Sequence, residues 1–262
     1  MKVRIVGRGR AGRSFELALR DAGVDVELLP GRAGSPRLAG AAEGCDALLL
    51  AVPDRHLGAV AAAVEPAPGC VLVHCSGSLG LDVLPAAFGR RASLHPLATL
   101  PDPVIGSLRL RGGTFFAVSG DPVATELALL LGGQPIVVAD GERARYHAAA
   151  CIASNHLVAL LGQVQRVAAE AGLPLEAFLP LARGALEDVG LLGPARALTG
   201  PASRGDEATI DAHRAVLGTA ELPGYDAGVA LARLLAGGAG GEAETAGAVP
   251  APAVPTRSSS WS

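Results

Sequence analysis

Short apolar runs recur along the first half of the chain, separated by helical or loop segments. They cover residues 2–6, 24–29, 47–52, 71–74, 92–95, 114–118 and 136–138. Runs that are apolar at successive positions are typical of strands covered on both faces. A helix over residues 14–22, ended by Gly23, joins the first two runs into a βαβ unit. The pattern predicts an α/β fold, with a Rossmann doubly wound parallel sheet over residues 1–139.

The apolar period changes at Asp140, and no strand pattern follows. We expect Asp140 to cap a long helix that Gly172 and Pro174 end. The predicted helices cover residues 142–171, 175–189 with a kink at Pro180, 206–217 and 225–235. Residues 140–236 are therefore predicted to form an all-α C-terminal domain. Residues 237–262 carry too little apolar bulk to repay the entropy of ordering, and a disordered tail is expected there.

Composition limits the kinds of partner that the protein is expected to bind and the cell compartment in which it is expected to work. The 262 residues carry a net charge of −3 without a dominant charged block, so nucleic acid is not expected as a partner. The longest apolar stretch, Ala148–Gly162, is interrupted by polar residues, so no membrane partner is expected. The amino-terminal segment lacks a secretory pattern, which makes the cytoplasm the expected compartment. The four cysteines lack metal-ligand spacing, and we expect no metal.

Lysine chemistry is not expected, because Lys2 is the only lysine of the chain. It opens the first predicted strand, far from the carboxyl end where open α/β sheets bind ligands. A Schiff base, a Walker lysine and a lysine general acid are therefore poor candidates.

A glycine-rich turn follows the first strand. Gly7, Gly9 and Gly12 form a GxGxxG pattern that includes Arg10 and Ala11, and a helix comes next. In such a unit the first glycine permits a tight turn, the second lets the backbone approach a diphosphate, and the third lets helix and strand pack closely. The helix terminus adds partial positive charge. This context favours dinucleotide binding; the alternative is a glycine turn without a ligand.

The segment after the second strand distinguishes NAD from NADP. An acidic residue there would accept a hydrogen bond from the ribose 2′-hydroxyl of NAD. The chain has Pro30-Gly31-Arg32 instead, and Glu27 lies inside the strand. Arg32, together with Arg10, is placed to pair with a 2′-phosphate, so NADP is favoured over NAD. The alternative is that Arg32 is a solvated loop residue.

Residues just past successive strands are expected to converge at the carboxyl edge of the sheet. Beyond the glycine turn these are Val52 and Pro53, then Ser76 and Gly77, then His95. Ser76 and His95 are expected nearest to a nicotinamide. Each also has a structural interpretation, as the end of a strand, a turn or a hydrogen-bonded structural histidine.

The long predicted helix carries polar residues in an Ala-rich segment. His147 and Asn155 are eight residues apart, roughly 12 Å along the helix axis, so they cannot both hold one carbonyl group. One is expected at the reacting group and the other at the far end of the substrate or at the nicotinamide amide. The alternative is that they join the helix to the sheet or to a dimer partner.

A glycine-proline loop near residue 200 supplies further candidates. Arg204 is placed to clamp a substrate carboxylate, with Thr199 in the same loop. The alternative is that Arg204 and Asp206 only stabilise the loop.

Six ordered motifs resemble a known family. They read GxGRAGxS, LLLAVPD, VHCSGSLG, SLHPL, RYHAAACIASNHL and LTGPASRGD. This order resembles the bacterial family that pairs a Rossmann-like domain with the region called domain of unknown function 2520. The resemblance covers about residues 1–235. The family is similar in layout to pyrroline-5-carboxylate reductase, ketopantoate reductase and the 6-phosphogluconate dehydrogenase group.

The resemblance implies an NADP-binding domain and a helical domain that forms a homodimer, but it implies no substrate. Ketopantoate reductases and hydroxyacid dehydrogenases of this layout use a helical-domain lysine, which this chain lacks. Their mechanism therefore cannot be carried over directly, whereas reduction of an imine needs less from a protein acid.

These observations lead to one hypothesis about function and two rivals. The chain is predicted to be an NADP-dependent oxidoreductase that transfers hydride between nicotinamide and a small carbonyl or imine acid. His147 or His95 would donate the proton, Asn155 and Ser76 would orient the substrate, and Arg204 would hold its carboxylate. The rivals are a non-catalytic NADP-binding regulatory or scaffold protein, and a structural dimer without cofactor.

Overall fold

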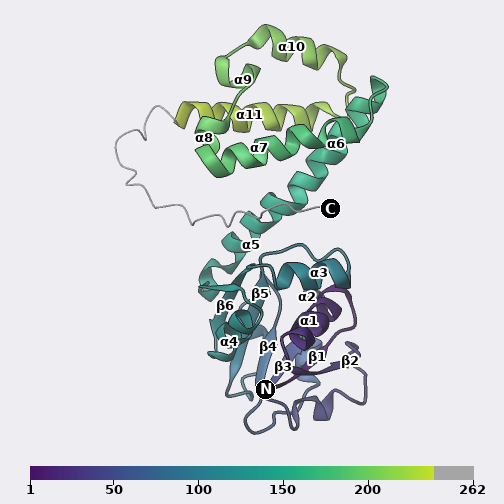
Figure 1. The fold of residues 1–262 in the computed structure, drawn as a ribbon, viewed down its shortest axis with the longest axis vertical. Coiled ribbons are helices and arrows are strands. Elements are labelled where there is room, and N and C mark those ends of the chain that lie inside the picture. The colour runs from purple at the N-terminus through teal and green to yellow at the C-terminus, as the bar shows by residue number, and fades with distance from the viewer. Residues whose placement is uncertain (239–262) are drawn as a thin grey trace, which may run out of the picture. The chain divides into compact units, whose positions relative to one another are not determined.

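The structure, a computed structural model, describes residues 1–238 of the chain (Figure 1). These residues form two compact units, the first covering residues 1–156 and the second beginning at Leu157. The predicted domain boundary at Asp140 marks the point where strands give way to helices, and the compact units divide later, within helical sequence.

The first unit is built on a seven-stranded sheet flanked by helices. Its strands are β1 (Lys2–Val6), β2 (Asp25–Leu29), β3 (Ala47–Leu50), β4 (Val71–His74), β5 (Arg91–Pro96), β6 (Phe115–Gly120) and β7 (Gln134–Val137). Its helices are α1 (Arg10–Asp21), α2 (Asp54–Ala62), α3 (Pro103–Leu110), α4 (Val123–Leu130) and α5 (Arg143–Cys151). Shorter helical turns are η1 (Ala39–Ala42), η2 (Leu81–Val83), η3 (Asp140–Glu142) and η4 (Ile152–His156).

The sheet order is β2-β1-β3-β4-β5-β6-β7, and the strands from β1 to β5 are all parallel. The predicted Rossmann fold is therefore confirmed. β6 departs from the parallel direction, because it pairs antiparallel with β5, and β7 runs parallel to β6. The Leu97 N–H donates to the Phe115 carbonyl oxygen at 2.8 Å, so β6 starts at the edge where β5 ends.

The two faces of the sheet bury separate apolar clusters, as alternation along a strand requires. Val3 and Ile5 of β1 share one cluster with Phe15 of α1, and Leu50 of β3 shares the other with Leu57 of α2. All five side chains are almost fully buried. The carboxyl edge of the sheet therefore rests on a rigid core.

The second unit is helical, as predicted. Its elements are α6 (Leu157–Glu170), η5 (Leu175–Ala177), α7 (Leu179–Leu192), α8 (Pro194–Ala197), α9 (Pro201–Arg204), α10 (Glu207–Val216) and α11 (Leu222–Gly238). Pro180 lies in the first turn of α7 rather than at a kink, because proline is tolerated where no intrahelical donor is needed. None of the helices within residues 1–238 has both the length and the apolar character to cross a membrane.

Three helix predictions need correction. The helix predicted over residues 142–171 is divided by a π-helical turn at Ile152–His156. Asp140 does not cap it, because its carboxylate accepts a hydrogen bond from the Leu81 N–H at 3.0 Å and α5 starts after Glu142. Helix α11 includes Gly237 and Gly238, the first two residues of the predicted tail, and residues 239–262 lie outside the described part of the chain.

Candidate active site

The glycine turn between β1 and α1 is packed as the GxGxxG pattern predicts. Gly7 has a φ of +123°, and its N–H donates to the carbonyl oxygen of Leu29 at 3.0 Å. A Cβ on Gly7 would lie 2.2 Å from the Ala51 carbonyl oxygen, and one on Gly12 would lie 1.8 Å from the Gly7 carbonyl oxygen. Packing within the protein therefore requires both glycines.

Gly9 is different, because no atom of the described residues outside its chain neighbours lies within 4 Å of the Cβ position. It is the N-cap of α1, and within residues 1–238 no side chain caps this helix and no acidic residue lies in its first turn. The first-turn amides belong to Arg10, Ala11 and Gly12. Free amides at a helix amino terminus bind anions, so this turn can hold a diphosphate.

The turn lies where the strand order reverses, between β1 and β3. A Cβ on Gly31 would lie 2.7 Å from Val52 Cγ1 and 2.9 Å from Gly7 Cα, so the loop after β2 passes directly over the turn. Pro53 is exposed and caps α2. Ligands of open α/β sheets bind at this switch point, which brings Val52 and Pro53 to the predicted place.

The loop after β4 is held by a carboxylate. The Ser76 hydroxyl donates to Asp54 Oδ2 at 2.8 Å and accepts from the N–H groups of Ser78 and Leu79 at 3.3 and 3.1 Å. Ser78 also donates its hydroxyl to Asp54 Oδ2, at 2.8 Å. The Ser76 hydroxyl is thus engaged within the loop, and its role in orienting a substrate stays a prediction.

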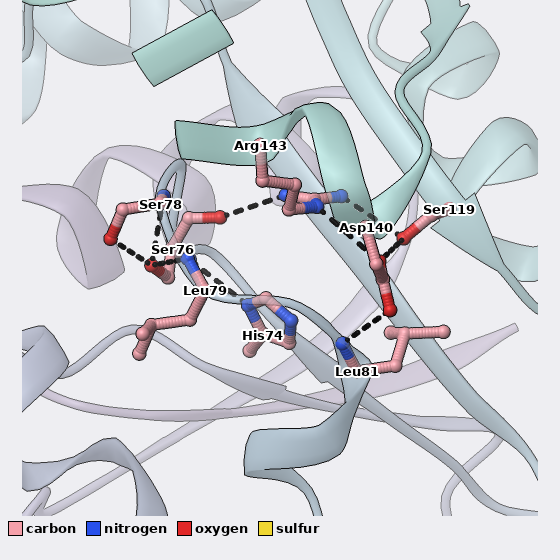
Figure 2. A network of polar contacts seen from close by, with 8 residues as sticks. All are labelled: His74, Ser76, Ser78, Leu79, Leu81, Ser119, Asp140 and Arg143. Atoms are coloured by element: carbon pink, nitrogen blue, oxygen red, sulfur yellow. Dashed lines mark hydrogen bonds and ion pairs between the residues drawn. The ribbon is translucent and has the colours of Figure 1, made fainter. Parts of the chain in front are cut away.

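Arg143 lies at the centre of a buried polar network at the start of α5 (Figure 2). Its guanidinium is fully buried; Nη1 donates to the Ser76 carbonyl oxygen at 3.1 Å and Nη2 donates to Ser119 Oγ at 3.0 Å. Its Nε lies 3.7 Å from Asp140 Oδ1, which is too long for a hydrogen bond. Arg143 therefore fixes α5 to the β4 loop and to β6. It also places a positive charge near His74 and His95.

His74 ends β4 and is fully buried below this network. Its Nδ1 accepts the Ser76 N–H at 3.2 Å, and its Nε2 has no partner among the described residues. The neutral ring therefore carries its proton on Nε2. Burial and the Arg143 charge lower the pKa of His74 to about 4.

His95, Tyr146 and His147 form a cluster of three rings at the carboxyl end of β5. His95 Nδ1 and the Tyr146 hydroxyl are 2.7 Å apart, and the ring centroids of His95 and His147 are 6.0 Å apart. A Cβ on Gly77 would lie 2.8 Å from His95 Nε2 and 2.6 Å from His147 Cδ2, so only glycine fits beside both histidines. The predicted residues Gly77, His95 and His147 therefore meet.

Two members of the cluster, His95 and Tyr146, have shifted pKa values. Burial lowers the pKa of His95 to about 4, with His147 and Arg143 adding to the effect and Asp54 opposing it. Burial raises the pKa of Tyr146 to about 12. Both groups are therefore neutral near pH 7.

Among the described residues, Asn155 makes no hydrogen bond to His95, Tyr146 or His147. It is exposed, and Ser154 donates its hydroxyl to Asn155 Oδ1 at 2.9 Å and to the Ala150 carbonyl oxygen at 2.8 Å. A role for Asn155 toward substrate stays a prediction. No group of three His, Cys, Asp or Glu side chains within residues 1–238 has the arrangement of a metal site.

Glu27 is occupied by an ion pair, because its Oε2 lies 2.8 Å from Arg4 Nε. It therefore does not offer a free carboxylate to a ribose. Arg32 is exposed in the loop after β2, the position at which an arginine would meet a 2′-phosphate.

Thr199 and Arg204 belong to the second unit. Thr199 lines an apolar cavity of about 630 Å³, together with Phe178, His213 and Tyr225, and Arg204 is the exposed last residue of α9. Their predicted role as substrate contacts stays a prediction.

Sequence reasoning missed Arg143 and Tyr146. Arg143 gave no signal because an arginine in a helical sequence is normally solvated, and only the fold reveals that it is buried. Tyr146 could have been found, because it stands next to His147 in a segment that is otherwise rich in alanine.

Comparison with known proteins agrees with this architecture. Residues 115–230 match the family described as a domain of unknown function, DUF2520, as the motifs predicted. None of the curated proteins matches the chain.

Three solved structures illustrate the shared layout. Protein TM1727 from Thermotoga maritima is 27% identical, with 90% of this chain and 99% of that chain covered and a TM-score of 0.67. Plasmodium falciparum pyrroline carboxylate reductase, solved with NADP bound, is 12% identical, with 90% and 98% covered and a TM-score of 0.61. A Streptomyces aurantiacus imine reductase is 19% identical, with 73% and 75% covered and a TM-score of 0.54. The two reductases share the fold with this chain.

Proposed function

We propose that this chain, which carries a DUF2520 domain, is an NADP-dependent oxidoreductase acting on a small carbonyl or imine acid. The observation that carries the proposal is the glycine turn with uncapped first-turn amides, placed on the same sheet edge as the cluster of His95, Tyr146 and His147. β5 lies three strands from β1, or about 14 Å at the usual strand spacing. An extended dinucleotide held at the turn would therefore reach toward the cluster.

Under this proposal, separate groups of residues bind the diphosphate, the 2′-phosphate and the substrate. The amides of Arg10, Ala11 and Gly12 hold the diphosphate, while Arg32 and Arg10 pair with the 2′-phosphate of NADP. The bound nicotinamide supplies the hydride chemistry, and the protein positions the substrate and stabilises the charge that develops on it. His95 and His147 border the reacting group.

The reductases of known structure that share this layout support the cofactor assignment. The Plasmodium reductase was solved with NADP, and an Aspergillus terreus reductive aminase was solved with NADPH. Arg32 after β2, together with the engagement of Glu27 by Arg4, favours NADP over NAD in this chain.

Replacing Gly9 tests the proposed cofactor site directly. The Gly9→Ala backbone is unstrained and its Cβ meets no protein atom beyond the chain neighbours, so the variant should unfold at the same urea concentration as the wild type within error. The Cβ would occupy the space of the diphosphate, so NADPH affinity measured by fluorescence titration should fall at least about 10-fold, or ~1.4 kcal/mol. NADH should bind the wild type more weakly than NADPH.

Gly89→Ala is the matched control, because its Cβ also meets nothing within 4 Å and Gly89 lies outside the site. It should bind NADPH as the wild type does. Equal NADPH affinity in wild type and Gly9→Ala would refute the site. An absorbance screen of NADPH oxidation with 2-oxo acids, simple ketones and cyclic imines then separates an enzyme from a protein that only binds NADP.

A further inference from the structure

The hydrogen bond between Tyr146 and His95 is not needed to attach α5 to the sheet. It joins β5 to α5, but Arg143 already fixes the first turn of that helix through two hydrogen bonds. The two rings stand edge to face, with centroids 5.6 Å apart and planes at 88°. His147 follows on the other side of His95, beside Gly77.

The protonation states of this pair suit proton transfer. Tyr146 keeps its phenolic proton at neutral pH, because burial raises its pKa to about 12. His95 is neutral and therefore has one ring nitrogen protonated and one free, because burial lowers its pKa to about 4. Either partner can donate in the 2.7 Å bond, so a proton can move along it without a separate charged acid.

The charges around the pair of His95 and Tyr146 favour a substrate that becomes negative. The buried Arg143 guanidinium lies one helical turn before Tyr146. It helps to lower the pKa values of His74 and His95, and it opposes the rise that burial causes in the pKa of Tyr146. Two carboxylates oppose it, but Asp54 accepts two hydroxyl hydrogen bonds and Asp140 is partly exposed. A cationic iminium would be repelled by the same charge that stabilises an alkoxide developing on a carbonyl oxygen.

We infer that Tyr146 is the catalytic proton donor of the proposed reductase, that His95 re-protonates it, and that the substrate is a ketone or aldehyde rather than a preformed iminium. The inference rests on the proposed function. The carbonyl carbon gains a hydride from the reduced nicotinamide, and the π-bond electron pair moves to oxygen. That oxygen takes the phenolic proton of Tyr146. As the phenolate takes the proton on His95 Nδ1, His95 Nε2, on the side of partly exposed His147, takes a proton from solvent, so the ring stays neutral and ends protonated on Nε2.

The Tyr146→Phe variant tests this inference when its rates of ketone reduction and of iminium reduction are each compared with those of the wild type. The variant lacks only the hydroxyl, so the kcat for the best ketone of the screen should fall at least about 100-fold, within the range of general acid catalysis. Reduction of 1-pyrroline at a pH where it is protonated should change less than about threefold, because the iminium already carries its proton. NADPH affinity should stay within about twofold.

The second unit offers a matched control. His213 Nδ1 and the Tyr225 hydroxyl are also 2.7 Å apart, with centroids 5.7 Å apart and planes at 87°. Tyr225→Phe removes an equivalent bond, and it should leave the ratio of ketone reduction to 1-pyrroline reduction within about twofold of the wild-type ratio. His95→Ala should slow ketone reduction about 10-fold and regain part of the rate with added imidazole, which a purely structural residue would not allow.

The outcomes separate this inference from the proposed function. Equal losses for ketone and iminium, unchanged ketone reduction in Tyr146→Phe, or a wild type that reduces only 1-pyrroline would overturn the proton donor and leave the reductase standing. A wild type that binds NADPH but reduces no compound of the screen would overturn the reductase and the proton donor with it. Failure to bind NADPH would remove the cofactor site itself.

Discussion

At the level of single residues, the site combines neutral titratable groups with one buried cation. His74 and His95 stay uncharged because burial and nearby Arg143 disfavour their protonated forms. Tyr146 stays protonated because burial disfavours the phenolate. These residues therefore link the stability of the fold to pH in a defined direction.

His74 gives the clearest pH prediction. Its pKa falls from the ordinary 6.5 to about 4 in the folded state, so between these values the unfolded chain binds more protons. The free energy of unfolding should drop as the pH falls from 6.5 to 4, by up to about 3 kcal/mol from this group, and no further below. His74→Asn keeps an acceptor near the Ser76 N–H and should flatten that dependence in urea denaturation.

Exposed His56 provides the control for that experiment. His56→Asn makes the same substitution at an exposed position, and its slope of stability against pH is the baseline for comparison. An unchanged slope in His74→Asn would show that the buried ring is not responsible.

Residue identity predicted only part of the site. Gly7, Gly12, Gly77 and His95 could be found because their positions at and after strand ends have geometric meaning in a parallel sheet. His147 could be found because it is a polar residue in an Ala-rich helical segment. The burial of Arg143 has no local signal in the sequence. Tyr146 could be marked as a candidate beside His147, but its contact with His95 of β5 is visible only in the fold.

At the level of elements, the first turn of α5 positions the site. Arg143 joins that turn to the β4 loop and to β6, and its removal would leave the Ser76 carbonyl oxygen and the Ser119 hydroxyl without their donor. Arg143→Met should therefore lower the free energy of unfolding by about 2–5 kcal/mol, measured by urea denaturation. Arg90→Met, which removes an exposed bidentate pair with Asp121, should cost much less. Equal costs would contradict the central place of Arg143.

Element boundaries were well predicted where periodicity decides them. The apolar runs over Lys2–Val6 and Val71–His74 became β1 and β4 without change. The reversed direction of β6 and the π-helical turn at Ile152–His156 were not predictable, because strand direction depends on the path of a loop and the turn leaves the apolar pattern intact.

At the scale of the whole molecule, the second unit leaves large apolar side chains uncovered. Leu181, Leu191 and Leu234 are 73%, 81% and 74% exposed. Extended exposed apolar surface is typical of interfaces, which supports the proposal of a homodimer through the helical domain. Light scattering should give twice the chain mass of 26.2 kDa, and Leu234→Glu should shift the protein toward the monomer. A monomeric wild type at micromolar concentration would contradict this.

Under the proposed function, the first turn of α1 holds a nicotinamide dinucleotide by its backbone amides. An NMR titration of the ¹⁵N-labelled protein with NADPH follows those amides individually. We expect saturable shifts of the Arg10, Ala11 and Gly12 signals, together with that of Gly77, at one common affinity. Shifts confined to other parts of the chain, or none at saturating NADPH, would contradict it.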